Sequence, residues 1–158
     1  MTKAIEKGDM APDINLTSDG GGQFRLSAHR GHPVIVFFYP KDDTKGCTME
    51  AIDFTAMKPD FDAIGAQIVG ISPDSPASHD KFAAKHGLAV TLASDEDKGV
   101  LKAFGVWTEK SMYGRKYMGV ERSTFLIDSK GRVAQVWRKV SVPGHVMEVL
   151  TAARDIAG

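Results

Sequence analysis

The side chain best suited to nucleophilic chemistry in this sequence is Cys47, the only cysteine of the chain. It lies in a short polar segment between the apolar run 34–39 and an expected helix. A sulfur in the first turn of a helix lies beside unpaired backbone N–H groups and the positive end of the helix dipole, which favours thiolate over thiol. A thiolate attacks peroxide oxygen, and the sulfenic acid that forms is reversible. Because an unpaired cysteine is often only a small buried apolar residue, its position alone leaves both interpretations open.

A single cysteine also limits the redox chemistry of the chain. It cannot form an internal disulfide, and the absence of a Cys-x-x-Cys pair argues against a disulfide oxidoreductase. The N-terminal segment lacks the apolar stretch of a secretory signal. Together these features predict a reducing, cytoplasmic location.

The charge balance gives no sign of a polyanionic partner. Lys and Arg together number 20, as do Asp and Glu, so the sequence has no electrostatic footprint for nucleic acid or an anionic membrane surface. The longest strongly apolar run, 34–39, is far too short to span a bilayer. We therefore expect a local site to carry the function, within one domain over residues 1–158.

The elements that must position the cysteine are a strand and a helix. The run 34–39 is continuously apolar and rich in β-branched and aromatic residues, as expected of a central strand covered on both faces. Pro40 ends this strand. A helix is predicted over 47–57, with Pro59 kinking or breaking it and Gly65 stopping its continuation.

The rest of the chain alternates strands and helices. Ser75 and Pro76 are predicted to begin a helix that stops near Gly87, and Ser94 and Asp97 have the spacing of a capping box for another. The other expected elements are a hairpin of 14–17 with 23–26, strands 67–72 and 90–93, a hairpin of 123–127 with 132–137, and a closing helix over 144–156. This order predicts an α/β fold with a central mixed sheet, helices on both faces and an N-terminal β-hairpin extension.

Several blocks of the sequence resemble the peroxiredoxins, specifically the Q-type branch, also called bacterioferritin comigratory proteins. The active-site signature of that family is Pro, three residues, Thr or Ser, two residues and Cys, and it is met by Pro40, Thr44 and Cys47. Further similar blocks, in the same order, are 41–44, 70–74, 78–82 and 112–128. The resemblance spans nearly the whole chain. It implies a thioredoxin-like fold and a thiol-dependent peroxidase that reduces hydrogen peroxide and organic hydroperoxides to water and alcohols.

The resemblance also implies how the reacting sulfur is activated. Cys47 would be the peroxidatic nucleophile. Arg122 matches the essential arginine of the family, and its guanidinium would stabilise the thiolate and the charge that develops on the leaving oxygen. Glu50, one helical turn beyond the cysteine, would orient Arg122.

Three further implied roles concern the peroxide itself. Thr44 would hydrogen bond to the peroxide and to the sulfur. Pro40 would shield the thiolate from water. The backbone N–H groups of Gly46 and Cys47 would help to hold the peroxide beside the sulfur.

Two positions depart from the Q-type pattern. Lys45 replaces the usual proline before the Gly-Cys pair and would add only modestly to thiolate stabilisation. Ile52 lies where many members carry a resolving cysteine, so the sulfenic acid cannot be resolved within the chain. The resemblance therefore implies a one-cysteine cycle completed by an external thiol, which is thioredoxin, glutaredoxin or glutathione, or Cys47 of a second molecule. It also implies a monomer or a weak homodimer.

Other residues suggest no second site. His29 and His32 lie close together, but no further His, Cys or carboxylate cluster completes a metal site, and all five histidines are interpreted as solvent-facing or capping residues. Trp107 and Trp137 are interpreted as core or near-site packing. No cofactor is expected beyond the thiol reductant. The alternative function is a non-catalytic redox sensor or holdase-type interaction protein, which would keep the thiolate but show little turnover with any reductant.

Overall fold

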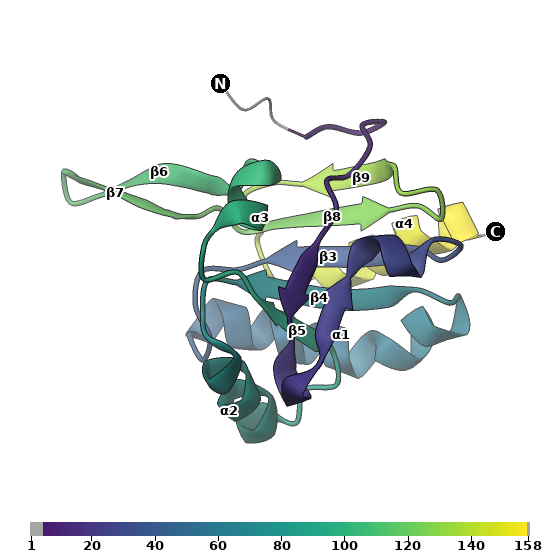
Figure 1. The fold of residues 1–158 in the computed structure, drawn as a ribbon, viewed down its shortest axis with the longest axis horizontal. Coiled ribbons are helices and arrows are strands. Elements are labelled where there is room, and N and C mark those ends of the chain that lie inside the picture. Colours follow the sequence, from purple (N-terminus) through teal and green to yellow (C-terminus); the bar gives the residue numbers. More distant parts are fainter. Residues whose placement is uncertain (1–4, 158) are drawn as a thin grey trace.

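The computed structural model describes residues 5–157, and a five-stranded mixed sheet forms its centre (Figure 1). The strands are β3 (Val34–Phe38), β4 (Gln67–Ser72), β5 (Thr91–Ser94), β8 (Ser123–Ile127) and β9 (Val133–Trp137). They lie in the order β5-β4-β3-β8-β9. β3, β4 and β5 are parallel, whereas β8 is antiparallel to both β3 and β9. The mixed sheet and the hairpin of β8 with β9 confirm the predictions for these segments.

Helices and two small hairpins surround this sheet. The α-helices within residues 5–157 are α1 (Lys45–Ala63), α2 (Pro76–His86), α3 (Gly99–Ala103) and α4 (His145–Ala157), and the 3-10 helices are η1 (Asp19–Gly21) and η2 (Leu26–His29). The hairpins are β1 (Asn15–Thr17) with β2 (Gln23–Arg25), and β6 (Trp107–Met112) with β7 (Arg115–Val120). In the described part of the chain, every helix is too short or too polar to cross a membrane.

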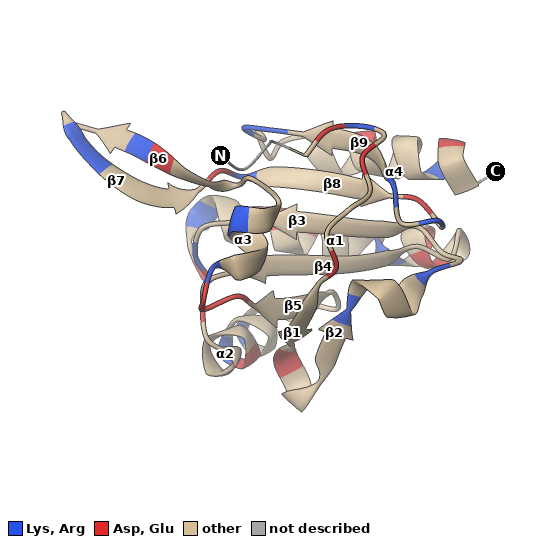
Figure 2. Cartoon of the chain, turned by 45° about the horizontal axis from the view of Figure 1, so that its top comes forward, with Lys and Arg blue, Asp and Glu red and all other residues tan. Residues whose placement is uncertain are grey.

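Strand β3 is buried on both faces because its alternate side chains enter two separate cores. Val34, Val36 and Phe38 belong to the core on the side of the N-terminal hairpin and α3. Ile35, Phe37 and Tyr39 belong to the other core, which contains the buried side chains of α1 and α4 and also includes Cys47. The central strands carry no Lys, Arg, Asp or Glu, as Figure 2 shows. This two-sided burial is why the run is continuously apolar.

The helix that follows β3 does not end at its proline. Of the predicted kink or break at Pro59, the break is wrong, because α1 continues to Ala63; the end of the helix just before Gly65 confirms the predicted stop. Phe54 and Phe61, one before and one after the proline, are fully buried and hold the whole segment against the core. The proline itself is exposed, so the carbonyl group that loses its helical donor lies on the solvent side. Tertiary packing therefore outweighs the helix-breaking tendency.

The predicted capping box before α3 is also wrong. The N-cap residue is Lys98, in the left-handed conformation with φ 65°. The carboxylate of Asp95, which is 2% exposed, accepts a hydrogen bond from the backbone N–H of Leu101 at 2.7 Å. Ser94 belongs to β5 instead. In contrast, the predicted start of α2 is confirmed, because the Ser75 hydroxyl accepts from the backbone N–H of Ser78.

The β6–β7 hairpin was not anticipated from the sequence. Its strands are mostly exposed and carry polar residues on both faces, so they lack the alternation that marks a half-buried strand. The turn is made by Tyr113 and Gly114, whose φ values are 51° and 78°. Two central residues with positive φ are typical of a two-residue hairpin turn. The hairpin extends away from the central sheet (Figure 1).

Candidate active site

The strand–loop–helix segment from β3 to α1 places Cys47 in the first turn of α1. The first helical hydrogen bond runs from the N–H of Thr48 to the carbonyl group of Thr44. The N–H groups of Gly46 and Cys47 precede this bond, so the helix does not use them. The sulfur side chain is 1% exposed and packs within the core that α1 and α4 share. The predicted position of the cysteine at the helix start is therefore confirmed.

Arg122 reaches the same place from a distant part of the sequence. β8 is antiparallel to β3, with Ser123 opposite Phe38, so the residue before β8 lies beside the end of β3. The Nη2 group of Arg122 donates to the Sγ atom of Cys47 at 3.2 Å. The guanidinium side chain is 18% exposed, which leaves it partly accessible from solvent. The sulfur is thus buried in the apolar core but has a cation on one side.

Glu50 holds the other arm of the guanidinium. The Nη1 group of Arg122 donates to Oε1 of Glu50 at 2.9 Å, and this carboxyl group is completely buried. Among residues 5–157, its second oxygen, Oε2, has no hydrogen-bond partner. Glu50 and Cys47 therefore accept from the two terminal nitrogens of the same guanidinium. The sequence predicted this pairing of Glu50 with Arg122, and the structure brings the two together.

The electrostatics of this pair follow from burial. Burial raises the pKa of Glu50 from 4.5 to about 7, although the positive charge of Arg122 opposes the change, and Asp53 adds to it. For Arg122, burial acts to lower the pKa, but the neighbouring Cys47 and Glu50 more than compensate and raise it. The guanidinium is therefore always charged, whereas Glu50 exchanges a proton near neutral pH.

Gly46 makes room for the arginine. A Cβ atom placed at this position would lie 3.0 Å from Nη2 of Arg122. That distance is tighter than an ordinary van der Waals contact, so a side chain here would displace the guanidinium or the helix start. Gly46 therefore has a packing role as well as the backbone role that the sequence analysis assigned to it.

Within the described part of the chain, neither Thr44 nor Pro40 makes a hydrogen bond with the sulfur of Cys47. Thr44 occupies the N-cap position of α1, is exposed, and its hydroxyl donates to the carbonyl of Lys41 at 2.8 Å. Pro40 is half-buried and lies two residues after the end of β3. Lys45 is exposed, where solvent screens its charge, and Ile52 is 42% exposed on α1.

Two histidines contradict the prediction that all five face solvent or cap helices. His79 is 0% exposed and His145 is 3% exposed. His79 lies three residues before Phe82 on α2, so both share the buried face of this helix. That spacing was the available signal. Both histidines make polar contacts inside the protein, since His79 lies 2.7 Å from a carboxylate oxygen of Asp42 and His145 lies 2.8 Å from the hydroxyl of Thr124.

His145 adds a neutral ring near the arginine. Its ring packs edge-on against Phe54 and Trp137. The pKa of His145 is lowered, mainly by burial. The charge of Glu148 acts to raise this pKa, and the charge of Arg122 acts to lower it.

Trp137 and Trp107 both pack against the cores, which confirms the prediction for the two tryptophans. No group of three or more metal-ligating side chains occurs within residues 5–157.

Comparison with known proteins shows which chains this one resembles. A sequence model described as the AhpC/TSA family matches residues 7–136. Peroxiredoxin Bcp of Xanthomonas campestris is 51% identical over 142 residues, which cover 90% of this chain and 89% of the relative. Peroxiredoxin Bcp of Bacillus subtilis is 46% identical over 153 residues, covering 97% and 98% of the two chains. A solved structure of the Xanthomonas campestris bacterioferritin comigratory protein, described in connection with alkyl peroxide reduction, has a TM-score of 0.90 at 47% identity and covers 99% of this chain and 100% of that one.

Proposed function

The chain belongs to the AhpC/TSA family as a hydroperoxide-reducing peroxiredoxin of the Bcp type, and we propose that Cys47 is the residue that attacks the peroxide. Both the family and the thioredoxin-like fold were predicted from the sequence, and the comparisons confirm them. One observation carries the assignment of Cys47. The only cysteine of the chain lies in a helix first turn with a guanidinium nitrogen 3.2 Å from its sulfur, the setting that stabilises a thiolate.

In the first step, the thiolate of Cys47 attacks the terminal oxygen of a hydroperoxide. A new S–O bond forms as the O–O bond breaks, so the sulfur is oxidised by two electrons and the peroxide is reduced by two. The leaving oxygen takes up a proton and departs as an alcohol, or as water when the substrate is hydrogen peroxide. The cysteine is left as a sulfenic acid, which thiols can reduce.

The residues around the sulfur supply stabilisation rather than further redox chemistry. Arg122 lies where its Nη2 group can donate both to the thiolate and to a peroxide oxygen as negative charge moves onto the leaving group. The unused N–H groups of Gly46 and Cys47 point from the helix start and would hold the other peroxide oxygen. Thr44 would exchange its bond to the Lys41 carbonyl for a bond to the peroxide. Pro40 would limit the access of water to the sulfur.

Glu50 acts through Arg122. Its Oε1 atom accepts from the guanidinium whether or not the carboxyl group is protonated, since a proton on the unpartnered Oε2 leaves Oε1 free. The ionised form binds the guanidinium more strongly. We assign Glu50 the role of holding Arg122 in its orientation.

The second half of the cycle needs a thiol from outside the chain. With one cysteine, the sulfenic acid condenses with an external thiol to a mixed disulfide, and water leaves. A second thiol then releases Cys47 as a thiol and carries away the disulfide. Thioredoxin, glutaredoxin and glutathione are the candidates, in a reducing compartment such as the cytoplasm, and the protein acts as a monomer or a weak homodimer.

Three measurements test this function. Cys47→Ser should abolish peroxide consumption, with Thr48→Ser as a control that alters a neighbouring residue. Intact mass after one equivalent of peroxide should show a trappable sulfenic acid or a covalent dimer. Steady turnover with each of the three thiol systems identifies the reductant. Peroxide consumption by Cys47→Ser at the wild-type rate would refute the assignment, and oxidation without turnover in any system would favour a redox sensor.

A further inference from the structure

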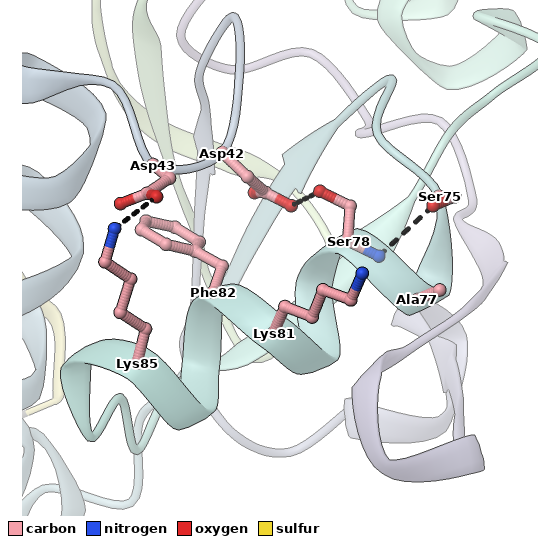
Figure 3. A pocket seen from close by; sticks show the side chains of 8 residues that line it. All are labelled: Asp42, Asp43, Ser75, Ala77, Ser78, Lys81, Phe82 and Lys85. Carbon is pink, nitrogen blue, oxygen red and sulfur yellow. Dashed lines mark hydrogen bonds and ion pairs between the residues drawn. The ribbon is translucent and has the colours of Figure 1, made fainter.

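A buried polar cluster joins the loop that connects β3 to α1 with the helix α2. Its centre is the carboxylate of Asp42, which is 7% exposed. Three groups converge on it: the hydroxyl of Tyr39 at 2.6 Å, the hydroxyl of Ser78 at 2.7 Å and Nδ1 of His79 at 2.7 Å. Figure 3 shows Ser78 reaching from α2 to Asp42. The mechanism proposed above uses none of these side chains.

The protons of this cluster can be assigned from its acceptors. Nε2 of His79 lies 3.0 Å from the backbone carbonyl oxygen of Ala93, which only accepts, so Nε2 carries a hydrogen. Nδ1 faces the Asp42 carboxylate, which already accepts from two hydroxyl groups. The distance of 2.7 Å between Nδ1 and the carboxylate oxygen fits a charge-assisted N–H donor, which places the third hydrogen on Nδ1. His79 is therefore an imidazolium paired with Asp42, and the two side chains are 0% and 4% exposed.

The electrostatics of the histidine agree with this assignment. Burial acts to lower the pKa of His79, but the hydrogen bond and negative charge of Asp42, the Ala93 carbonyl and the charge of Asp74 outweigh burial and raise it. The phenol of Tyr39 faces the same carboxylate, and burial together with Asp42 raises its pKa well above the usual range, so it stays a neutral donor. The cluster thus has one negative and one positive member at its centre.

The loop is attached to α2 at two consecutive residues. The N–H of Asp42 donates to Asp74 at 2.7 Å, in addition to the contacts of its side chain with α2. Asp43, at φ 59°, directs its carboxylate to Lys85 at 2.7 Å (Figure 3). The same carboxylate lies 2.8 Å from Nε2 of His86. The Asp43 contacts are exposed and screened by solvent. The buried Asp42 contacts are therefore the ones that fix the loop.

A pocket between the β3–α1 loop and α2 means that the polar contacts of Asp42 hold the loop against the helix on this side. A pocket of about 360 Å³ lies between the loop and α2, lined by Asp42, Asp43, Ser75, Ala77, Ser78, Lys81, Phe82 and Lys85. Loop and helix are therefore not joined by continuous apolar packing on this side. An ion pair with fixed geometry specifies position where apolar contacts do not, and a buried pair of this kind is lost if either charge is removed.

We propose that Asp42 and His79 are positioning residues for peroxide reduction, whose buried ion pair fixes the loop that runs from Pro40 to Thr44 and leads into the first turn of α1, where Cys47 lies. The inference rests on the proposed function of Cys47. Asp42 acts through the backbone, since it lies midway between the proline and the threonine of the signature. Neither Asp42 nor His79 contacts the sulfur.

Asp42→Asn is the direct test, because it keeps the shape of the side chain and removes its charge. The new amide would donate to Nδ1, so His79 would lose one proton, which nitrogen NMR of the imidazole detects. The loop would lose its strongest anchor, and oxidation of Cys47 by peroxide in a single turnover should slow about tenfold to a hundredfold. Alkylation of the thiolate by iodoacetamide should not slow, because the first turn of α1 and Arg122, and not the loop, stabilise the ionised form of Cys47. Lys81→Ala, an exposed change on the same helix, should alter none of these values.

The possible outcomes separate this inference from the proposed function. If wild-type protein does not consume peroxide through Cys47, the proposed function fails. If it does, but Asp42→Asn is oxidised as fast as Lys81→Ala, only the positioning role fails. A singly protonated His79 in the wild type, or equal slowing of oxidation and alkylation, also overturns it. Should Asp42→Asn not fold, Tyr39→Phe removes one donor at nearly constant volume, and an unchanged oxidation rate in that variant counts against the role.

Discussion

Replacing Glu50 with glutamine removes the buried negative charge while keeping an oxygen that can accept from Arg122. In the wild-type protein the pKa of Glu50 rises from 4.5 to about 7 on folding, chiefly because the carboxyl group loses its hydration. Between these two values the folded state holds a proton that the unfolded state has released. The proton on Glu50 therefore stabilises the folded state at low pH. This contribution is lost, and the free energy of unfolding falls, as the pH rises through this window.

The size of the effect follows from the two pKa values. The difference between 4.5 and about 7 corresponds to roughly 3 kcal/mol, since one pKa unit is equivalent to about 1.4 kcal/mol. Glutamine does not titrate, so Glu50→Gln lacks this contribution. The free energy of unfolding of the variant, minus that of the wild type, should rise by up to about 3 kcal/mol from pH 4.5 to pH 7 and then level off.

Urea unfolding of both reduced proteins at a series of pH values measures this difference directly. All other titrating groups occur in both proteins, so most of their contributions cancel in the difference. The same variant should react more slowly with peroxide, because a neutral amide holds the guanidinium less firmly than a carboxylate does. A stability difference that stays constant across the pH series would refute the argument that burial controls the protonation of Glu50.

Three further substitutions test the packing and charge around the sulfur. Arg122→Ala should slow the first oxidation at least tenfold, because a hydrogen bond to a charged group contributes about 2 kcal/mol; stopped-flow oxidation by peroxide measures this, and an unchanged rate would contradict the role of Arg122. Gly46→Ala should slow the same step roughly tenfold, since its Cβ atom would lie 3.0 Å from Nη2 of the arginine. Gly99→Ala is its matched control, because nothing lies within 4 Å of a Cβ atom there, and equal rates in the two variants would show that the contact is unimportant. Phe54→Ala should lower the free energy of unfolding by about 3–5 kcal/mol, since Phe54 is fully buried and stacks on Phe37 at 4.7 Å; a loss in denaturant unfolding of less than about 1 kcal/mol would mean that this core refills the space.

Errors in the sequence analysis have physical causes that can be traced to particular residues. The prediction that Pro59 kinks or breaks the helix used the local cost of proline, but two buried phenylalanines, one on each side of it, keep the segment helical. The capping box assigned to Ser94 was displaced by Asp95, which reaches the helix start from a turn whose path the sequence does not reveal. The histidines were assigned by residue type, although His79 shares a helix face with Phe82.

Local sequence was enough to place the sulfur. The continuously apolar run 34–39, the proline that ends it and the helix that begins beside Cys47 are all short-range features, and each depends on residues within a few positions of one another. The single thiol and the missing resolving cysteine are also properties of the sequence itself. Arg122 and Glu50 could be named only because the chain resembles a family.

The tertiary structure alone decided how those groups meet. Arg122 lies 75 residues from Cys47 in the sequence and reaches it because β8 pairs with β3 in antiparallel register. The protonation of Glu50, the clearance above Gly46 and the ion pair of Asp42 with His79 depend equally on long-range packing. Burial of the whole sheet selects which distant strands pair. The local sequence around Cys47 therefore does not indicate that the strand beside β3 will bring Arg122 to the sulfur.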